Sequence, residues 1–157
     1  GDSRVWTPHQ TYGGGDIAEW ASTIPNGDYW SRLDVNRANN PAPTSIWWQI
    51  CDLRADTGSR ADVEAVPAEL RRRMPGATVF VSPLADFQTP ETCPKQDIRN
   101  SNLLADHAVA TGNAQPGPIL PMVLSEWIAP PNGDGRCHVG ELGREAFGAA
   151  VSSFPWN

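Results

Sequence analysis

The stretches SIWWQIC (residues 45–51) and ATVFVSPL (residues 77–84) are short apolar runs, each bounded by turn-forming residues. Runs of this length and composition are typical of buried strands. Trp47 and Trp48 are neighbours in the first run, so their side chains are expected on opposite faces of a sheet. We therefore expect one tryptophan to pack under each of two helical layers.

Helical patterns precede, separate and follow these strands, and helices are expected over residues 16–22, 28–37, 60–74, 97–110 and 141–154. Asp28 is expected to cap the second helix. Pro67 predicts a kink in the third helix, or a start later than Asp62. Residues 112–121 are expected to form a loop. The alternation of helices with buried strands indicates one α/β domain, residues 1–157, with a parallel sheet between two helical layers.

Ligands of such sheets bind at the carboxyl ends of the strands. The loops that follow the two strands and the segment before the last helix should therefore share one edge. This places residues 52–57, 82–87 and 134–138 in one neighbourhood.

The composition argues against two classes of partner. The formal net charge is −6, whereas a nucleic-acid-binding protein needs a basic surface, so no nucleic-acid partner is expected. No apolar run approaches the roughly 20 residues that cross a bilayer, so no membrane span is expected.

The chain has three cysteines. Cys51 lies in an apolar run and is expected to be a buried thiol. Cys93 and Cys137 lie in polar, loop-like stretches, where a disulfide and a pair of reduced thiols are both open. No pair has the C-x-x-C spacing of a zinc site.

The stretch NGDGRCHVGELG (residues 132–143) places Asp134 and His138 just before the last expected helix. A histidine beside a carboxylate in a loop suits a general base that the carboxylate orients. The alternative is a histidine that makes a structural hydrogen bond at the start of a helix.

The stretch YGGGDIAEW (residues 12–20) opens the first helix with a glycine run. Backbone N–H groups at Gly14 and Gly15 would be accessible to an anion or to a developing oxyanion. The alternative is a plain tight turn. The run matches neither G-x-G-x-x-G nor a P-loop, so nucleotide binding is not expected.

Four stretches in this order carry a family resemblance: YGGGDI (12–17), IWWQICDLR (46–54), PGATVFVSPL (75–84) and GDGRCHVGELGREAFGAAV (133–151). They resemble successive blocks of the SGNH (GDSL-type) hydrolases, over about residues 10–155. The last block of that family often reads D-x-C-H-x-x-x-x-G, and Cys137, His138 and Gly143 fit it. The resemblance implies a flavodoxin-like three-layer α/β/α fold and a serine ester hydrolase.

The resemblance also implies roles for residues. A serine would attack the ester, His138 would take its proton, and Asp134 would orient His138. Gly15, next to Gly14, would donate an N–H to the oxyanion. No metal or organic cofactor is implied, and the substrate would be a small acyl or carbohydrate ester.

The chain departs from the family pattern at two places. The acid usually lies three residues before the histidine, where this chain has Gly135, and Asp134 lies four before it. The asparagine expected after the third-block strand falls on Leu53. Arg54, or the backbone there, would have to supply the missing donor; the alternative is that Arg54 forms a solvated ion pair with Asp52.

The nucleophile has two candidate positions. Gly1-Asp2-Ser3 matches the family's G-D-S, but only residues 4–12 separate Ser3 from the glycine run, too few for the usual helix and strand. In the other alignment the serine lies on a further N-terminal strand. A sheet without its central strand leaves unpaired backbone groups, each costing about 1–3 kcal/mol. Either a second peptide completes the sheet, or the fold is reduced.

The chain has seven tryptophans, and Trp6, Trp20 and Trp30 are candidates either for lining a pocket or for packing in the core. If they hold a sugar, the alternative function is a non-catalytic carbohydrate-binding module on the same scaffold. His107 lies within a helix and is expected at the surface. His9 lies near the glycine run and is a weaker candidate for contact with a ligand.

Overall fold

The computed structural model describes residues 15–54, 57–89, 93, 96–129 and 137–156. Their three strands form a parallel sheet in the order β1-β2-β3: β1 (Ser45–Gln49), β2 (Thr78–Ser82) and β3 (Gln115–Pro116). The expected α/β class with a parallel sheet is therefore confirmed. β3 lies in the segment expected to be a loop, and that expectation is wrong at these two residues.

The helices are α1 (Ile17–Ser22), α2 (Asp28–Ala38), α3 (Arg60–Arg73), α4 (Ile98–Ala110), α5 (Ser125–Ile128) and α6 (Glu141–Ser153). Ser59 and Asp62 form a capping box that starts α3 at Arg60, so a start later than Asp62 is wrong and Pro67 lies inside the helix. The N-cap of α2 is Gly27, and Asp28 is the first helical residue, which corrects the expected cap.

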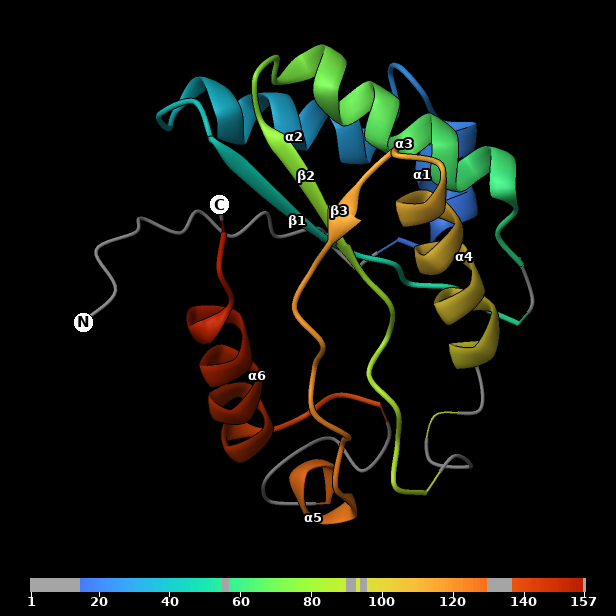
Figure 1. Cartoon of the computed structure of the whole chain (residues 1–157), viewed down its shortest axis with the longest axis vertical. Coiled ribbons are helices and arrows are strands. Elements are labelled where there is room, and N and C mark those ends of the chain that lie inside the picture. The colour runs from blue at the N-terminus through green and yellow to red at the C-terminus, as the bar shows by residue number, and fades with distance from the viewer. Residues whose placement is uncertain (1–14, 55–56, 90–92, 94–95, 130–136, 157) are drawn as a thin grey trace.

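One face of the sheet is covered by α1, α2, α3 and α4 (Figure 1). The core between them joins Val79 and Val81 of β2 to Val63 and Val66 of α3 and to Leu104 of α4. These side chains are at most 3% exposed. Trp48 packs against this core, so it faces the helices that surround it.

The opposite face is covered by α6 (Figure 1). Trp47 packs here with Phe147 and Val151 of α6, and Phe80 of β2 packs edge-to-face against Phe154 and Trp156 after the helix. Trp47 and Trp48 therefore lie on opposite faces, as expected, and helices lie on both sides of the sheet.

β1 lies at one edge of the sheet. Its one strand neighbour among the described residues is β2, and all five of its side chains are only half-buried. In β2, four of the five side chains are buried. Within the described chain, β1 and β3 are the two edge strands, and β1 is the longer edge on which a further strand would extend the sheet.

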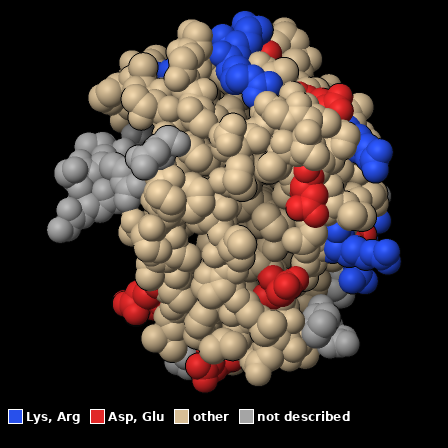
Figure 2. Space-filling model, viewed as in Figure 1, with Lys and Arg blue, Asp and Glu red and all other residues tan. Residues whose placement is uncertain are grey.

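The surface charge is unevenly distributed. In Figure 2, basic side chains lie along the upper and right-hand borders of the molecule, and the centre of this face carries few charges. No continuous basic surface is seen on this face. Among the described residues, no helix has the length and apolar character needed to cross a membrane.

Candidate active site

A cavity of about 300 Å³ lies at the carboxyl edge of the sheet. Gln49 ends β1, Leu84 and Phe87 follow β2, and His138 precedes α6. The other lining residues are Ala85, Gln96, Val123, Cys137, Val139, Arg144 and Phe147. Of the three segments expected to share this edge, the loop after β2 and the segment before α6 meet at the cavity, whereas none of the described residues 52–54 lines it. β1 contributes Gln49.

Buried hydroxyl groups hold the strand ends around this edge together. Ser101 of α4 donates a hydrogen bond to the Ile50 carbonyl (3.0 Å) and accepts one from the Leu84 N–H (2.9 Å). Ser82 accepts a hydrogen bond from Trp47 Nε1 (2.9 Å) and donates one to the Pro118 carbonyl (2.6 Å). Both serines are fully buried, and each makes two hydrogen bonds that hold the strand ends beside the cavity in place.

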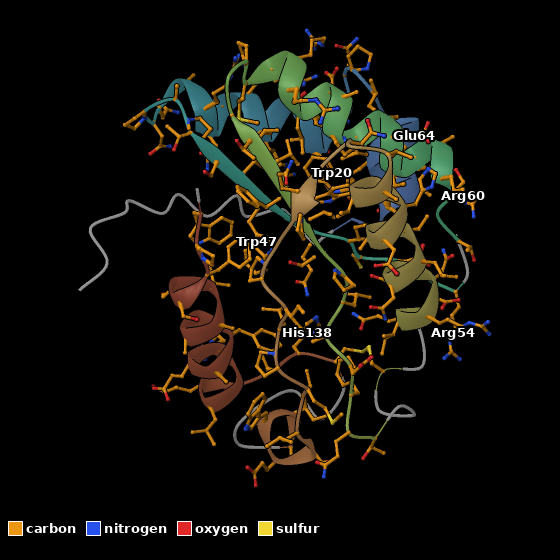
Figure 3. All side chains as sticks on the ribbon, viewed as in Figure 1. Trp20, Trp47, Arg54, Arg60, Glu64 and His138 are labelled. Carbon is orange, nitrogen blue, oxygen red and sulfur yellow. A yellow bond between two sulfur atoms is a disulfide. The ribbon has the colours of Figure 1, made fainter. Side chains whose placement is uncertain are left out.

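His138 is exposed and lies between two fixed points of the chain. Cys137 is bonded to Cys93, and the Gly140 N–H donates to the Trp127 carbonyl (2.8 Å). Gly143 allows Val139 to pack closely against the first turn of α6, because a side-chain carbon at residue 143 would lie 2.5 Å from Cβ of Val139. Figure 3 shows His138 beside the N-terminal end of α6. Asp134, its expected orienting carboxylate, lies outside the described residues.

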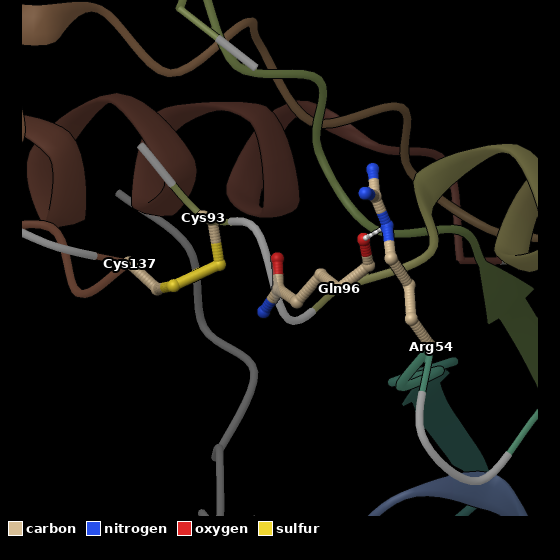
Figure 4. The surroundings of a disulfide bond; sticks show 4 residues. All are labelled: Arg54, Cys93, Gln96 and Cys137. Carbon is tan, nitrogen blue, oxygen red and sulfur yellow. Dashed lines mark hydrogen bonds between the residues drawn. A yellow bond between two sulfur atoms is a disulfide. The ribbon is translucent and has the colours of Figure 1, made fainter. Parts of the chain in front are cut away.

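The Cys93–Cys137 disulfide joins the segment between β2 and α4 to the segment before α6 (Figure 4). The Cα atoms of the two cysteines are 4.9 Å apart. Of the two states left open by the sequence, the structure therefore has the disulfide. Because Cys137 lines the cavity and directly precedes His138, this bond holds the candidate base at the cavity wall.

Arg54 lies at the surface rather than at the cavity. Its Nε donates to the backbone carbonyl of Gln96 (3.1 Å), and it is not one of the lining residues (Figure 4). Figure 3 shows it at the opposite side of the molecule from α6. The structure does not bring Arg54 together with His138, and its proposed role as an oxyanion donor gains no support.

Asp52 corrects a second expectation about this loop. Its carboxylate is fully buried, accepting hydrogen bonds from the Gly58 N–H (2.7 Å) and from Nδ2 of Asn100 (2.9 Å). A solvated ion pair with Arg54 is therefore wrong. Asp52 instead fixes the loop between β1 and α3 against α4.

Gly15 lies near the carboxyl end of β1, because the N–H of Ile17 donates to the Cys51 carbonyl (2.9 Å), but Gly15 does not line the cavity with His138. Its φ is +54°, and a side-chain carbon there would lie 2.6 Å from the Tyr29 ring. Only glycine fits this position without strain. Asp16 then caps α1 through the Glu19 N–H. Ser3 and Gly14 lie outside the described residues.

Cys51 is half-buried next to this turn. Burial chiefly, with the nearby Asp16, Asp52 and Glu19 carboxylates, raises the pKa of its thiol to about 11. The expected buried thiol is thus partly exposed, but it stays protonated at neutral pH. A nucleophilic role for Cys51 has no support from this environment, because the thiolate is the reactive form.

The folded protein without reductant is expected to react with iodoacetamide only at Cys51. The pKa of the Cys51 thiol is about 11, against an ordinary value of 9.0. At pH 7 its thiolate fraction, and with it the reaction rate, should therefore be about 100 times lower than that of an ordinary thiol. Cys93 and Cys137 become reactive only after reduction. Mass spectrometry should count one modified cysteine after unfolding in guanidinium and three after reduction. Three modified cysteines without reductant would contradict the disulfide.

The candidate tryptophans and the remaining histidine that the structure describes lie outside the cavity. Trp30 is fully buried and Trp20 packs against it at 4.9 Å between ring centroids, so both belong to the core and neither lines the cavity. His107 is partly buried and lies 2.8 Å from Oε1 of Glu64. Trp6 and His9 lie outside the described residues.

Three polar residues of the cavity were not indicated by the sequence: Gln49, Gln96 and Arg144. Oε1 of Gln96 is buried and has no hydrogen-bond partner among the described residues. The guanidinium of Arg144 has no partner among the described residues. Gln49 Nε2 makes only a long contact with the Pro83 carbonyl, 3.4 Å. No motif singles out these residues, because each belongs to an ordinary strand, loop or helix.

Comparison of the chain with protein-family models, with curated proteins and with solved structures gave no match. Within the described residues, no group of three or more His, Cys, Asp or Glu side chains is arranged to hold a metal ion. The function is therefore argued from the cavity itself.

Proposed function

We propose that this chain is a serine ester hydrolase with an SGNH-type α/β/α architecture. One observation carries the proposal. His138 lines a cavity at the carboxyl edge of a parallel sheet, and the Cys93–Cys137 bond and the Gly140–Trp127 hydrogen bond fix the chain on either side of it. A histidine placed in this way is suited to transfer a proton at a reacting group.

The mechanism is acyl transfer. A serine hydroxyl attacks the ester carbonyl, and His138 takes the hydroxyl proton and later returns it to the leaving alcohol. Asp134 holds the imidazole in the required tautomer. The Gly15 N–H, together with that of the nucleophile, stabilises the oxyanion. Gly15 adjoins the same strand, β1, whose last residue lines the cavity.

The nucleophile belongs to a strand that pairs with the open edge of β1. A serine at the carboxyl end of such a strand would lie between the Gly15 turn on one face of the sheet and the His138 segment on the other. The half-buried side chains of β1 support a further strand at this edge. Ser3 is one candidate, and a serine on a second peptide that completes the sheet is the other.

The substrate is a small acyl or carbohydrate ester. The size of the cavity, about 300 Å³, is at the lower end of ligand pockets, and most of its lining side chains are apolar. These features favour a short acyl group. No described tryptophan lines the cavity, so no specific observation favours the alternative of a non-catalytic glycan-binding module.

A fluorophosphonate probe tests the proposal, because it reacts with a serine that a histidine activates. We expect the purified protein, with any peptide that accompanies it, to gain one adduct by intact mass. The His138→Ala variant should gain none under the same conditions. Absence of an adduct on the wild type, where a control esterase is fully labelled, would overturn the proposal.

A further inference from the structure

Resting on the proposed function, we infer that Arg144 binds a carboxylate at the far end of the acyl chain of the substrate. The substrate class is then an ester of a short dicarboxylic acid, with one carboxyl esterified and the other free. Arg144 is exposed, and it lines the cavity together with His138 and an apolar wall.

Arg144 is an unpaired cation on the cavity. No carboxylate or carbonyl of the described chain contacts its guanidinium, whereas Arg54 donates to the Gln96 carbonyl and Arg73 is paired with Glu69 and Asp34. A planar guanidinium that keeps all its donors available matches the two oxygens of a carboxylate.

The position of Arg144 adds to the attraction for an anion. It lies near the start of α6, whose N-cap Gly140 has no side-chain cap, and the N-terminal end of a helix carries partial positive charge. Glu141 lies in the same turn, but it forms no ion pair with Arg144 among the described residues. The helix end does not stabilise the positive charge of Arg144. An anionic ligand is attracted both by the guanidinium and by the N-terminal end of the helix.

The apolar lining places the acyl group, rather than the alcohol, inside the cavity. Leu84, Phe87 and Phe147 offer an apolar wall to a hydrocarbon chain. His138 is exposed, so an alcohol that accepts its proton leaves toward solvent.

The test compares two esters of equal chain length. p-Nitrophenyl adipate monoester carries a free carboxylate, and p-nitrophenyl hexanoate does not. We expect Arg144→Gln to lower kcat/KM for the anionic ester about 10- to 100-fold, the range for a lost hydrogen-bonded charge pair, and to leave the neutral ester unchanged. Arg144→Lys should fall between. Arg99→Gln, an exposed arginine near the start of α4 and outside the cavity, is the matched control.

The outcomes separate the inference from the function on which it rests. Equal effects of Arg144→Gln on both esters, or no effect on either, would overturn the role of Arg144 while leaving the hydrolase intact. If the wild type hydrolyses neither of these esters nor p-nitrophenyl acetate, the proposed function fails. Calorimetry with monomethyl and dimethyl adipate then tests binding at Arg144 without turnover. Preference for the monoester by the wild type and its loss in Arg144→Gln would support the site. Equal binding of both would refute it.

Discussion

Replacing His138 with alanine is expected to reduce ester hydrolysis at least about 10³-fold in kcat, because in the proposed mechanism His138 takes the proton of the nucleophile. The loss should appear in kcat rather than in KM, since the proposed role of His138 lies in the transition state and the rest of the cavity wall stays in place. Hydrolysis of p-nitrophenyl acetate under saturating conditions measures it. Circular dichroism should show an unchanged fold, because His138 is exposed and contributes no core packing.

His107→Ala is the matched control for this loss. His107 contacts Glu64 between α4 and α3, and Figure 3 shows Glu64 at the upper right, away from His138 near the centre of the view. Its removal should leave kcat unchanged. If His138→Ala hydrolyses the ester as fast as His107→Ala, the proposed acyl-transfer mechanism is wrong.

Glu69→Gln is expected to lower the free energy of unfolding by about 2 kcal/mol, because it removes one of the two carboxylates that pair with the buried Arg73. Glu69 and Arg73 are 6% and 7% exposed, and Arg73 Nε lies 2.6 Å from Glu69 Oε1. Arg73 also donates to Asp34 and to the Pro25 carbonyl, and it lies 4.9 Å over the Trp30 ring. The network therefore ties α3 to α2 and to the turn before it.

Urea unfolding measures this effect, and Glu64→Gln is the control. Glu64 lies on the same helix, but its side chain is 50% exposed, so its replacement should cost less than about 1 kcal/mol. Equal losses for the two variants would contradict the assigned importance of the buried network.

The same carboxylate gives the stability a pH dependence. Hydrogen bonds from Arg72, opposed by burial and reinforced by Arg73, hold the pKa of Glu69 below its ordinary 4.5. A lowered pKa in the folded state stabilises the protein above the unfolded-state pKa, and this contribution is lost as the pH falls through the folded value. Unfolding free energy should thus fall below about pH 4.5 more steeply in the wild type than in Glu69→Gln.

The main elements of the fold could be predicted because their patterns are local. The apolar runs at 45–51 and 77–84 became β1 and β2, and the tryptophan pair separated to the two faces. β3 escaped prediction because its two residues, Gln115 and Pro116, have no strand pattern and pair with β2 only through the tertiary fold. The alternative of a late start for α3 failed because the Ser59–Asp62 capping box outweighs Pro67.

The candidate site was predictable only in part. A histidine before a helix is visible in the sequence, whereas the presence of Gln96 and Arg144 at the cavity depends on how distant segments pack together. Asp52 shows the same limit, because its partners Gly58 and Asn100 are distant or unpatterned in sequence. Burial and long-range hydrogen bonding, which no local motif encodes, decide these cases.

The position of a fluorophosphonate label shows whether His138 activates a serine at this cavity. After reaction, peptide mapping identifies the modified residue in the wild type and in His138→Ala. We predict one labelled serine, either Ser3 or a serine of an accompanying peptide, and no label when His138 is absent. A label that persists at full stoichiometry without His138, or no label on the wild type, would contradict the claim that His138 activates a serine at this cavity.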